Sequence, residues 1–245
     1  MKVHILGSSS KGNCYILESS TEALIVEVGL PPVTIKKALQ WNLKKIVGAL
    51  ISHSHDDHAG FISEITDLGV TTLALQDVFK SHGISGKPFT KEIEPLKRYK
   101  LGGFMIQGVS VPHDVPCLSF VITHQDMGKL LFVTDAVTFG YKVSQLNHVM
   151  IEANYADDIL SDNIANEVIP PSMRPRLLKS HMEIGTTKEV LSEQDLSMVD
   201  NIILIHLSRN NSDASRFIKE VQESTGKSVY VADHGMVLDL SVNPY

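Results

Sequence analysis

The stretch Ser52-His53-Ser54-His55-Asp56-Asp57-His58 follows the pattern His-x-His-x-Asp-His, with four side chains that can bind a metal ion. It comes directly after Ile46 to Ile51, a continuous apolar run that is typical of a strand buried on both faces. Imidazoles suit zinc and similar divalent ions, and a carboxylate also accepts harder ions such as Mn²⁺. Packing alone would not favour such a group of side chains, so the stretch predicts a metal site at the end of a buried strand.

Three further polar residues stand at the ends of apolar runs elsewhere in the chain. They are His113 after 109–112, Asp135 after 130–134 and His206 after 202–205. One loop rarely supplies all the ligands of two metal ions, and α/β folds build their sites where strands end. A single residue of this kind is more often a turn former or a cap, but three of them beside the His-x-His-x-Asp-His motif indicate remote ligands.

Strand patterns dominate both ends of the chain, and helical patterns separate them. We expect strands at 3–6, 14–17, 23–28, 46–51, 71–75, 104–111, 118–123, 130–134, 149–152, 201–206, 228–232 and 237–240. We expect helices from Pro31-Pro32, over 57–69 and over 212–224, and a largely helical segment from 157 to about 191 that Pro170-Pro171 and Pro175 interrupt. No low-complexity linker, tandem repeat or abrupt change of composition divides the chain, so we expect one domain over residues 1–245.

The composition is that of a folded protein without long disorder: 245 residues, of which 43% are hydrophobic and 20% charged. No segment reaches the roughly 18 uncharged apolar residues that span a bilayer, and the first residues lack the apolar stretch of a signal peptide. We therefore expect a cytoplasmic protein without a membrane partner. Cys14 and Cys117 fit a reducing compartment, and since neither belongs to a Cys-x-x-Cys pair, we expect small buried side chains rather than zinc ligands.

The formal net charge of −6 does not favour nucleic acid as a partner, because phosphate contacts usually come from clustered Lys and Arg. Bound divalent cations would nevertheless place positive charge where the chemistry occurs. Lys11, Arg174, Arg176 and Lys179 could form a basic wall beside the site, although a run of charges is more often a solvated face.

The motif His53-x-His55-x-Asp57-His58, followed by His113, Asp135 and His206 in that order, resembles the ligand series of the metallo-β-lactamase superfamily. Further stretches resemble one branch of it, the YycJ (WalJ) family, which is close to the tRNase Z and β-CASP nucleases. They are Gly7-Ser8-Ser9-Ser10-Lys11-Gly12-Asn13-Cys14, His113-Asp114 and His206-Leu207-Ser208-Arg209-Asn210-Asn211. The resemblance implies an α/β (α+β) fold of the four-layer αββα type, with two mixed sheets flanked by helices.

The resemblance also implies two divalent metal ions, Zn²⁺ or Mn²⁺, in one site. His53, His55 and His113 would hold one ion, Asp57, His58 and His206 would hold the other, and Asp135 would bridge them. Such a pair can generate a bridging hydroxide and stabilise the charge that develops on a phosphodiester. Asp57 would in addition orient this nucleophile.

Two positions depart from the pattern of the superfamily. Glu27 stands in Ile25-Val26-Glu27-Val28-Gly29 where relatives commonly have Asp, and we expect it to hydrogen-bond the loops that carry the metal ligands. Ala136-Val137 follows Asp135 in place of the usual Thr-Gly, which predicts a changed rim of the site.

Cleavage of a phosphodiester also needs a proton for the departing oxygen. In tRNase Z relatives a Glu-Ala pair and a later His act together as orienter and proton donor, and Glu152 and His181 match them in type and order. A carboxylate beside an imidazole raises the pKa of the imidazole and keeps it able to donate near neutrality. The alternative is a strand-end carboxylate and a helix-surface histidine without catalytic roles.

The turn Ser208-Arg209-Asn210-Asn211 beyond His206 offers hydroxyl, guanidinium and amide groups that could bind a phosphate or the 5′ end of a strand. A turn that caps a helix starting at Ser212-Asp213 explains the same residues. The remaining histidines match no motif position and are expected not to bind metal: His4, His82, His124, His148 and His234.

We therefore expect a dinuclear metal-dependent phosphodiesterase, a nuclease that acts on DNA or RNA and works from an end of the strand. The alternative enzyme class on the same fold is a hydrolase of a small thioester, lactone or cyclic phosphodiester, which the acidic charge balance would favour. A metal-binding regulator or scaffold is a third reading, in which a complete ligand set would have no purpose. The sequence leaves the oligomeric state open, and a homodimer is one of the alternatives.

Overall fold

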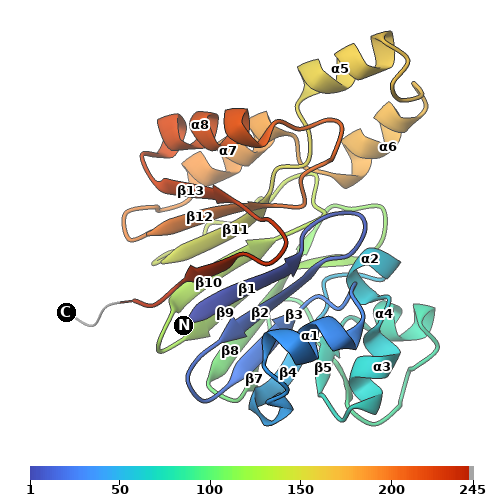
Figure 1. Cartoon of the computed structure of the whole chain (residues 1–245), viewed down its shortest axis with the longest axis vertical. Coiled ribbons are helices and arrows are strands. Elements are labelled where there is room, and N and C mark those ends of the chain that lie inside the picture. The colour runs from blue at the N-terminus through green and yellow to red at the C-terminus, as the bar shows by residue number, and fades with distance from the viewer. Residues whose placement is uncertain (243–245) are drawn as a thin grey trace.

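Two seven-stranded sheets pack face to face in the computed structural model, which describes residues 1–242 (Figure 1). The first sheet has the strand order β14-β1-β2-β3-β4-β5-β6. Its strands are β1 (Lys2–Gly7), β2 (Cys14–Glu18), β3 (Ala23–Val26), β4 (Ile46–Leu50), β5 (Thr72–Ala74), β6 (Thr90–Glu92) and β14 (Val237–Asp239). Neighbouring strands are antiparallel from β14 to β3 and parallel from β3 to β6, so the sheet is mixed.

The second sheet has the order β13-β12-β11-β10-β9-β8-β7. Its strands are β7 (Arg98–Leu101), β8 (Phe104–Val111), β9 (Cys117–His124), β10 (Gly128–Val133), β11 (His148–Glu152), β12 (Asn201–Ile205) and β13 (Ser228–Val231). It is parallel from β13 to β10 and antiparallel from β10 to β7. Both sheets therefore join a parallel half to an antiparallel half.

Helices cover the outer face of each sheet (Figure 1). Beside the first sheet lie α1 (Pro32–Ala38), a 3₁₀ turn (Leu43–Lys45), α2 (Asp56–Ala59), α3 (Ile62–Asp67) and α4 (Gln76–Ser81). Beside the second sheet lie α7 (Ile184–Glu193) and α8 (Ala214–Thr225), while α5 (Asp157–Ala165) and α6 (Met173–Ser180) form a hairpin that projects at the upper right of Figure 1. None of the helices described is long and apolar enough to cross a membrane.

Alternating side chains of the central strands pack on opposite faces of their sheet. On β10, Leu130 and Phe132 lie in the apolar cluster between the sheets, whereas Leu131 and Val133 lie in the cluster beneath α7 and α8. Successive side chains of a strand point to opposite faces, so a strand buried on both sides must be apolar throughout. Three apolar clusters thus separate four layers, and the four-layer αββα fold expected from the sequence is confirmed.

The best-defined helix boundaries follow from capping groups. The Asp213 carboxylate accepts a hydrogen bond from the backbone N–H of Arg216, 3.0 Å away, which satisfies one of the free donors at the start of α8. The helix ends where Gly226 adopts a left-handed conformation with φ of 66°. The N-cap is therefore Asp213, within the pair Ser212-Asp213 named from the sequence.

Several elements differ from those expected from the sequence. The helix expected over 57–69 is two helices, α2 and α3, separated by Gly60 and Phe61. Pro175 does not interrupt a helix, because it lies in the first turn of α6, where the missing N–H of proline has no partner to lose. The sequence predicted no element at β6, β7 or α4. Cys14 and Cys117 are buried and not disulfide-bonded, as expected.

Three backbone segments interlock beside the end of β4. The N–H of Asn13 donates to the carbonyl of Asp57 at 2.7 Å, and the N–H of Gly29 donates to the carbonyl of Asn13 at 3.0 Å. A Cβ atom on Gly29 would lie 1.8 Å from the Asp57 carbonyl oxygen, far inside van der Waals contact. Glycine at position 29 therefore permits the loop after β3 to approach α2.

We expect Gly29→Ala to lower the free energy of unfolding by about 2–3 kcal/mol or more, because the added methyl forces these backbone segments apart. Gly140→Ala is the matched control, since a Cβ there meets nothing within 4 Å. Chemical denaturation of both variants measures the effect. Equal unfolding midpoints would show that the contact does not constrain the fold.

Candidate metal centre

The residues of the His-x-His-x-Asp-His motif and the three strand-end residues meet at one edge of the two sheets. His53 and His55 lie between β4 and α2, and Asp57 and His58 lie in α2 itself. The other three follow β8, β10 and β12, and they are His113, Asp135 and His206. These strands run in the same direction within the second sheet, so their carboxyl ends share an edge, where α/β folds place their sites.

One cluster contains His53, His55, His113 and Asp135. The Nε2 atom of His53 lies 3.0 Å from Nδ1 of His55, and Nε2 of His113 lies 3.4 Å from the same Nδ1. Oδ2 of Asp135 is 3.8 Å from Nε2 of His53 and 4.0 Å from Nε2 of His113. Three imidazole nitrogens and one carboxylate oxygen thus converge on one point.

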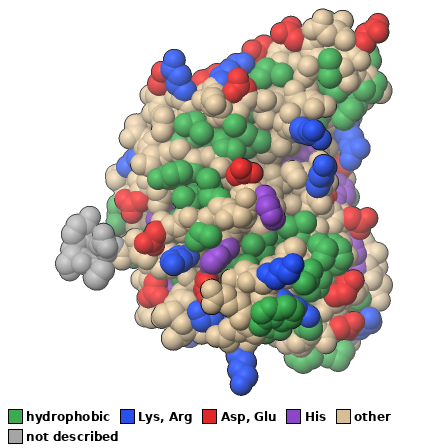
Figure 2. Space-filling view, viewed as in Figure 1, with side chains coloured by type: hydrophobic (Ala, Val, Ile, Leu, Met, Phe, Trp, Pro, Cys, Tyr) green, Lys and Arg blue, Asp and Glu red, His purple; other side chains and the backbone are tan. Residues whose placement is uncertain are grey.

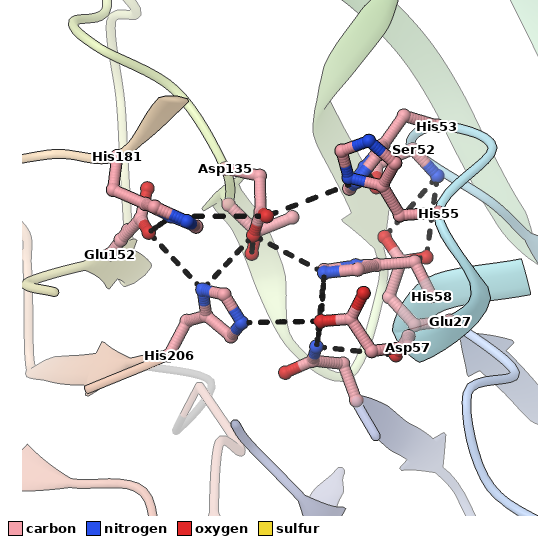
Figure 3. Close-up of polar contacts among 12 residues, drawn as sticks. Glu27, Ser52, His53, His55, Asp57, His58, Asp135, Glu152, His181 and His206 are labelled. Carbon is pink, nitrogen blue, oxygen red and sulfur yellow. Dashed lines mark hydrogen bonds and ion pairs between the residues drawn. The ribbon is translucent and has the colours of Figure 1, made fainter. Parts of the chain in front are cut away.

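A second cluster contains Asp57, His58 and His206 (Figure 3). Oδ2 of Asp57 lies 3.4 Å from Nε2 of His58 and 3.5 Å from Nε2 of His206. The other oxygen of Asp135, Oδ1, lies 3.2 Å from Nε2 of His58 and 3.1 Å from Nδ1 of His206. Asp135 therefore faces one cluster with each of its carboxylate oxygens.

Both clusters suit divalent cations. Imidazole nitrogens that face one another at hydrogen-bond distance compete for protons, whereas a cation at their centre accepts a lone pair from each. Nε2 of His206 is buried and has no hydrogen-bond partner among the described residues. On the far side of its ring His113 donates from Nδ1 to the carbonyl of Ser180 at 2.9 Å, which leaves Nε2 as the lone-pair donor toward the cluster. Buried His and Asp clusters of this kind are consistent with a site for two metal ions.

Glu27 lies behind the second cluster and is fully buried. Its carboxylate accepts a hydrogen bond from the backbone N–H of Ser52 at 3.2 Å, immediately before His53. Its Oε2 also lies 3.6 Å from Nδ1 of His58, on the side of the ring opposite to Asp57 and Asp135. A carboxylate in this position fixes the orientation of the imidazole.

Glu152 and His181 lie next to the second cluster and contact each other. Oε1 of Glu152 is 2.7 Å from Nδ1 of His181 and 3.1 Å from Nδ1 of His206 (Figure 3). Its Oε2 accepts a hydrogen bond from the backbone N–H of Ala136 at 3.0 Å. Burial alone would lower the pKa of His181, but the charge of Glu152 raises it above its usual value. His181 therefore holds a proton readily at neutral pH, within 3.9 Å of Oδ2 of Asp135.

The two clusters differ in their protonation. Burial lowers the pKa of His53 and of His113, so these rings are neutral at pH 7. Burial would also lower the pKa of His58 and His206, but Asp135 and the other carboxylates raise it, to about 10 for His206. In the second cluster the imidazoles thus carry protons that a metal ion must displace.

Three residues at this edge have a left-handed backbone although none is glycine. The φ angles are 64° for Glu27, 46° for Asp135 and 54° for His206. Such a conformation costs about 1–3 kcal/mol at a non-glycine residue and persists only where the surroundings impose it. Each of these residues follows the end of a strand, where the turn directs its side chain toward the clusters rather than onward along the sheet.

The turn after His206 is partly occupied by its own hydrogen bonds. The Ser208 hydroxyl accepts from the N–H of Asn211 at 3.3 Å, and the Ser208 carbonyl accepts from the Ser212 hydroxyl. Arg209 and Asn210 are exposed, so their side chains are accessible to a ligand.

One member of the basic wall suggested by the sequence is engaged elsewhere. The guanidinium of Arg174 pairs with the carboxylate of Asp157 and donates to the hydroxyl of Ser161 at 2.9 Å. Lys11, Arg176 and Lys179 remain exposed.

The five other histidines lie outside both clusters. His4 and His124 pair with Glu18 and Glu22, and His148 and His234 contact backbone carbonyls. His82 donates from Nε2 to the carbonyl of Ser54 at 3.0 Å and so supports the loop that carries His53 and His55. This contact could not be predicted from the sequence, because His82 matches no motif.

Sequence reasoning also missed two polar neighbours of the clusters. The amide of Asn13 lies 2.9 Å from Nε2 of His58 and 3.3 Å from Oδ2 of Asp57. Oδ1 of Asp114 lies 3.0 Å from Nε2 of His113 and 3.4 Å from Nε2 of His55. Both residues lie within the stretches that carried the resemblance, and this position in the sequence could have identified them as neighbours of the site.

Comparisons with known proteins agree with this geometry. A family model described as the metallo-beta-lactamase superfamily matches residues 9–145. A Bacillus anthracis protein named exodeoxyribonuclease YycJ is 24% identical over 225 residues, which cover 85% of this chain and 83% of that protein. A Streptococcus pneumoniae serotype 2 protein named exodeoxyribonuclease WalJ is 26% identical over a 262-residue alignment, which covers 98% of this chain and 93% of that protein. The solved structure of the metallo-beta-lactamase fold protein YhfI from Bacillus subtilis matches with a TM-score of 0.70 at 18% identity, covering 97% of this chain and 99% of that one.

We expect the affinity for Zn²⁺ to fall as the pH is lowered from 8 to 6.5. His58 and His206 have raised pKa values and are protonated in this range, so an ion that binds in the second cluster must displace protons, and its affinity changes about tenfold per pH unit for each proton displaced. Competition with a chromophoric chelator measures the affinity. The exposed His234→Gln variant should show the same dependence, and an affinity independent of pH would contradict the assignment.

Proposed function

Because the chain belongs to the metallo-beta-lactamase superfamily, we propose that it is a metal-dependent exonuclease that hydrolyses DNA phosphodiesters. The superfamily and the likeness to YycJ and WalJ expected from the motifs are confirmed, and the chain is a hydrolase of this fold with a metal-site cluster. The nuclease activity is the part of the proposal that goes beyond the superfamily and the hydrolase class. The contact between Glu152 and His181 beside the clusters is the observation that carries it.

The residues that would hold the ions are those of the two clusters. His53, His55 and His113 would hold one ion, Asp57, His58 and His206 the other, and Asp135 would contact both. When bound, a pair of divalent cations such as Zn²⁺ or Mn²⁺ supplies Lewis acidity and an activated water for hydrolysis. The donor set of imidazoles and carboxylates accepts either metal.

Asp57 has the chemistry of a group that orients a water molecule. Burial would raise its pKa, but the imidazoles of His206 and His58 hold that pKa well below its usual range, so the group is a carboxylate at neutral pH. Its polar contacts with Asn13, His58 and His206 all involve Oδ2. Oδ1 is therefore available to accept a hydrogen bond from water.

Glu152 and His181 have the chemistry of a proton-donating pair. The carboxylate of Glu152 is fully buried, and its hydrogen bond fixes Nδ1 of His181 as the protonated inner nitrogen. The His181 side chain is 17% exposed, so its outer edge can reach a leaving oxygen. General acid catalysis by a positioned histidine contributes about 10²–10⁴-fold to a rate.

The names of the relatives support the proposed substrate class. Both are named exodeoxyribonucleases, and their alignments span nearly the whole of each chain, which supports DNA as the substrate and an end as the point of attack. Arg209 and Asn210, exposed beyond His206, supply charged and amide donors for a terminal phosphate. The net charge of −6 makes such local cations necessary for binding a polyanion.

We expect His181→Ala to slow degradation of a DNA oligonucleotide with added Mn²⁺ by roughly 10²–10⁴-fold, because the leaving oxygen loses its proton donor. Hydrolysis of bis-p-nitrophenyl phosphate should change far less, since p-nitrophenolate leaves without a proton. Metal content, measured by elemental analysis, should equal that of the wild type, and the exposed His234→Ala variant should behave as wild type.

Three outcomes would contradict parts of this proposal. Loss of metal in His181→Ala would make His181 a ligand, and equal losses on both substrates would remove its role as proton donor. Wild-type protein that hydrolyses bis-p-nitrophenyl phosphate without degrading any oligonucleotide would favour the small-molecule hydrolase.

We expect Arg209→Ala to reduce the rate on 5′-phosphorylated single-stranded DNA by about tenfold or more, because a charge-assisted bond to the terminal phosphate is lost. The rate on the 5′-hydroxyl strand should stay unchanged. Arg98→Ala, which removes an exposed arginine from β7, is the control. Equal wild-type rates on the two strands would show that this turn does not recognise the 5′ end.

A further inference from the structure

The two helices of the α5–α6 hairpin are held together by apolar and polar contacts. It encloses a small apolar cluster of Tyr155, Leu160, Ile169 and Leu177. Arg174 on α6 bonds to Asp157 and Ser161 on α5, so the two helices are also tied on their polar side. The hairpin can therefore carry side chains in fixed positions.

Both helices of the hairpin are attached to the edge where the clusters lie. The Asn163 amide of α5 donates to the carbonyl of Asn210 at 2.7 Å, in the turn beyond His206. The last residue of α6, Ser180, accepts the hydrogen bond from Nδ1 of His113, and His181 follows it directly. The position of α6 is thus set relative to the histidines of the site.

The exposed face of α6 carries unpaired positive charge. Arg176 and Lys179 stand three residues apart, so they are neighbours on the helix surface, and both are exposed, whereas Leu177 and Ser180 are buried. No carboxylate among residues 1–242 lies within ion-pair distance of either. Figure 2 shows several Lys and Arg side chains beside histidine on the right of the molecule, below the projecting hairpin.

The positive face is narrow. The neighbouring helix α5 is acidic in its first turns: Asp157 pairs with Arg174, Asp158 pairs with Arg216, and Asp162 is exposed and has no ion pair among the described residues. A second polyanionic chain laid across the hairpin would meet the Asp162 carboxylate. The charge distribution therefore matches one phosphate backbone along α6 and disfavours two.

We propose that α6 binds the sugar-phosphate backbone of a single DNA strand, through Arg176 and Lys179, while the end of that strand lies at the metal centre. This inference rests on the proposed nuclease function and adds the form of the substrate and the residues that hold it. Side chains three residues apart on a helix are about 5–6 Å apart at Cβ, which lets them reach successive phosphates of one strand. Lys and Arg side chains without an ion pair in the protein contribute most to DNA affinity, because they break no ion pair when they contact a phosphate.

The test is the double variant Arg176→Glu/Lys179→Glu. The control is Lys44→Glu/Lys219→Glu, which changes the net charge equally at exposed positions on the 3₁₀ turn and on α8. Binding of a fluorescent single-stranded oligonucleotide is measured against salt concentration by anisotropy, and degradation of the same strand is measured with Mn²⁺. Hydrolysis of bis-p-nitrophenyl phosphate reports on the catalytic site and the fold.

We expect the test variant to bind the oligonucleotide roughly 20-fold more weakly at 0.1 M salt, with a salt dependence shallower by about 1.4 in the log–log slope, as for two lost contacts to single-stranded DNA. Its turnover of bis-p-nitrophenyl phosphate should match that of the wild type. The control should bind as the wild type does.

Two results would overturn the inference alone: wild-type binding by the test variant, or an equal loss in the control. The wild type could instead bind duplex DNA more strongly than single-stranded DNA, with the same sensitivity to the α6 charges. That result would show that α6 binds a duplex and not a single strand. Wild-type protein that hydrolyses bis-p-nitrophenyl phosphate and neither binds nor degrades any oligonucleotide would overturn the proposed function, and the inference with it.

Discussion

Buried carboxylates at one edge of the fold constrain the position of the two sheets relative to each other. Glu27 comes from the first sheet, Asp135 and Glu152 come from the second, and each is at most 2% exposed. A buried carboxylate is tolerated only with close partners, and removal of one partner costs about 3–5 kcal/mol. Asp135 finds one of its partners in His58, which belongs to the layers on the other side of the central core. The sheets therefore cannot slide past each other without leaving a buried charge unpaired.

The same edge also contains strained backbone. Left-handed turns at Glu27, Asp135 and His206 are imposed by the surrounding packing, since an isolated chain would avoid them. Apolar packing in three separate clusters supplies the stability that holds these turns. At this edge the fold thus holds unfavourable backbone conformations that direct polar side chains toward one another.

The sequence predicted those features that depend on local pattern. The segment from His53 to His58 predicted a metal site because it places four possible ligands within six residues. Asp135 and His206 were predicted as ligands because they follow apolar strands. The short β6 was missed because Thr90–Glu92 carries no alternating apolar pattern. Arg174, one of the residues of the predicted basic wall, pairs with Asp157 instead. This pairing depends on how α5 and α6 pack against each other, which the sequence pattern does not show. The pairing of Glu152 with His181, which are 2.7 Å apart, was expected from the resemblance alone, because spacing along the chain does not encode the tertiary packing that brings them together.

The wide separation of the clustered residues along the chain has a consequence for biosynthesis. His53 leaves the ribosome long before His206, and at about 5–20 residues per second the interval is on the order of ten seconds. During that time the nascent His-x-His-x-Asp-His segment offers only part of a ligand set, since the strands that carry Asp135 and His206 are still missing. An ion captured early would be held by few donors and would exchange readily. Loading with metal is therefore expected to follow translation and to depend on the ion supply that the completed protein meets.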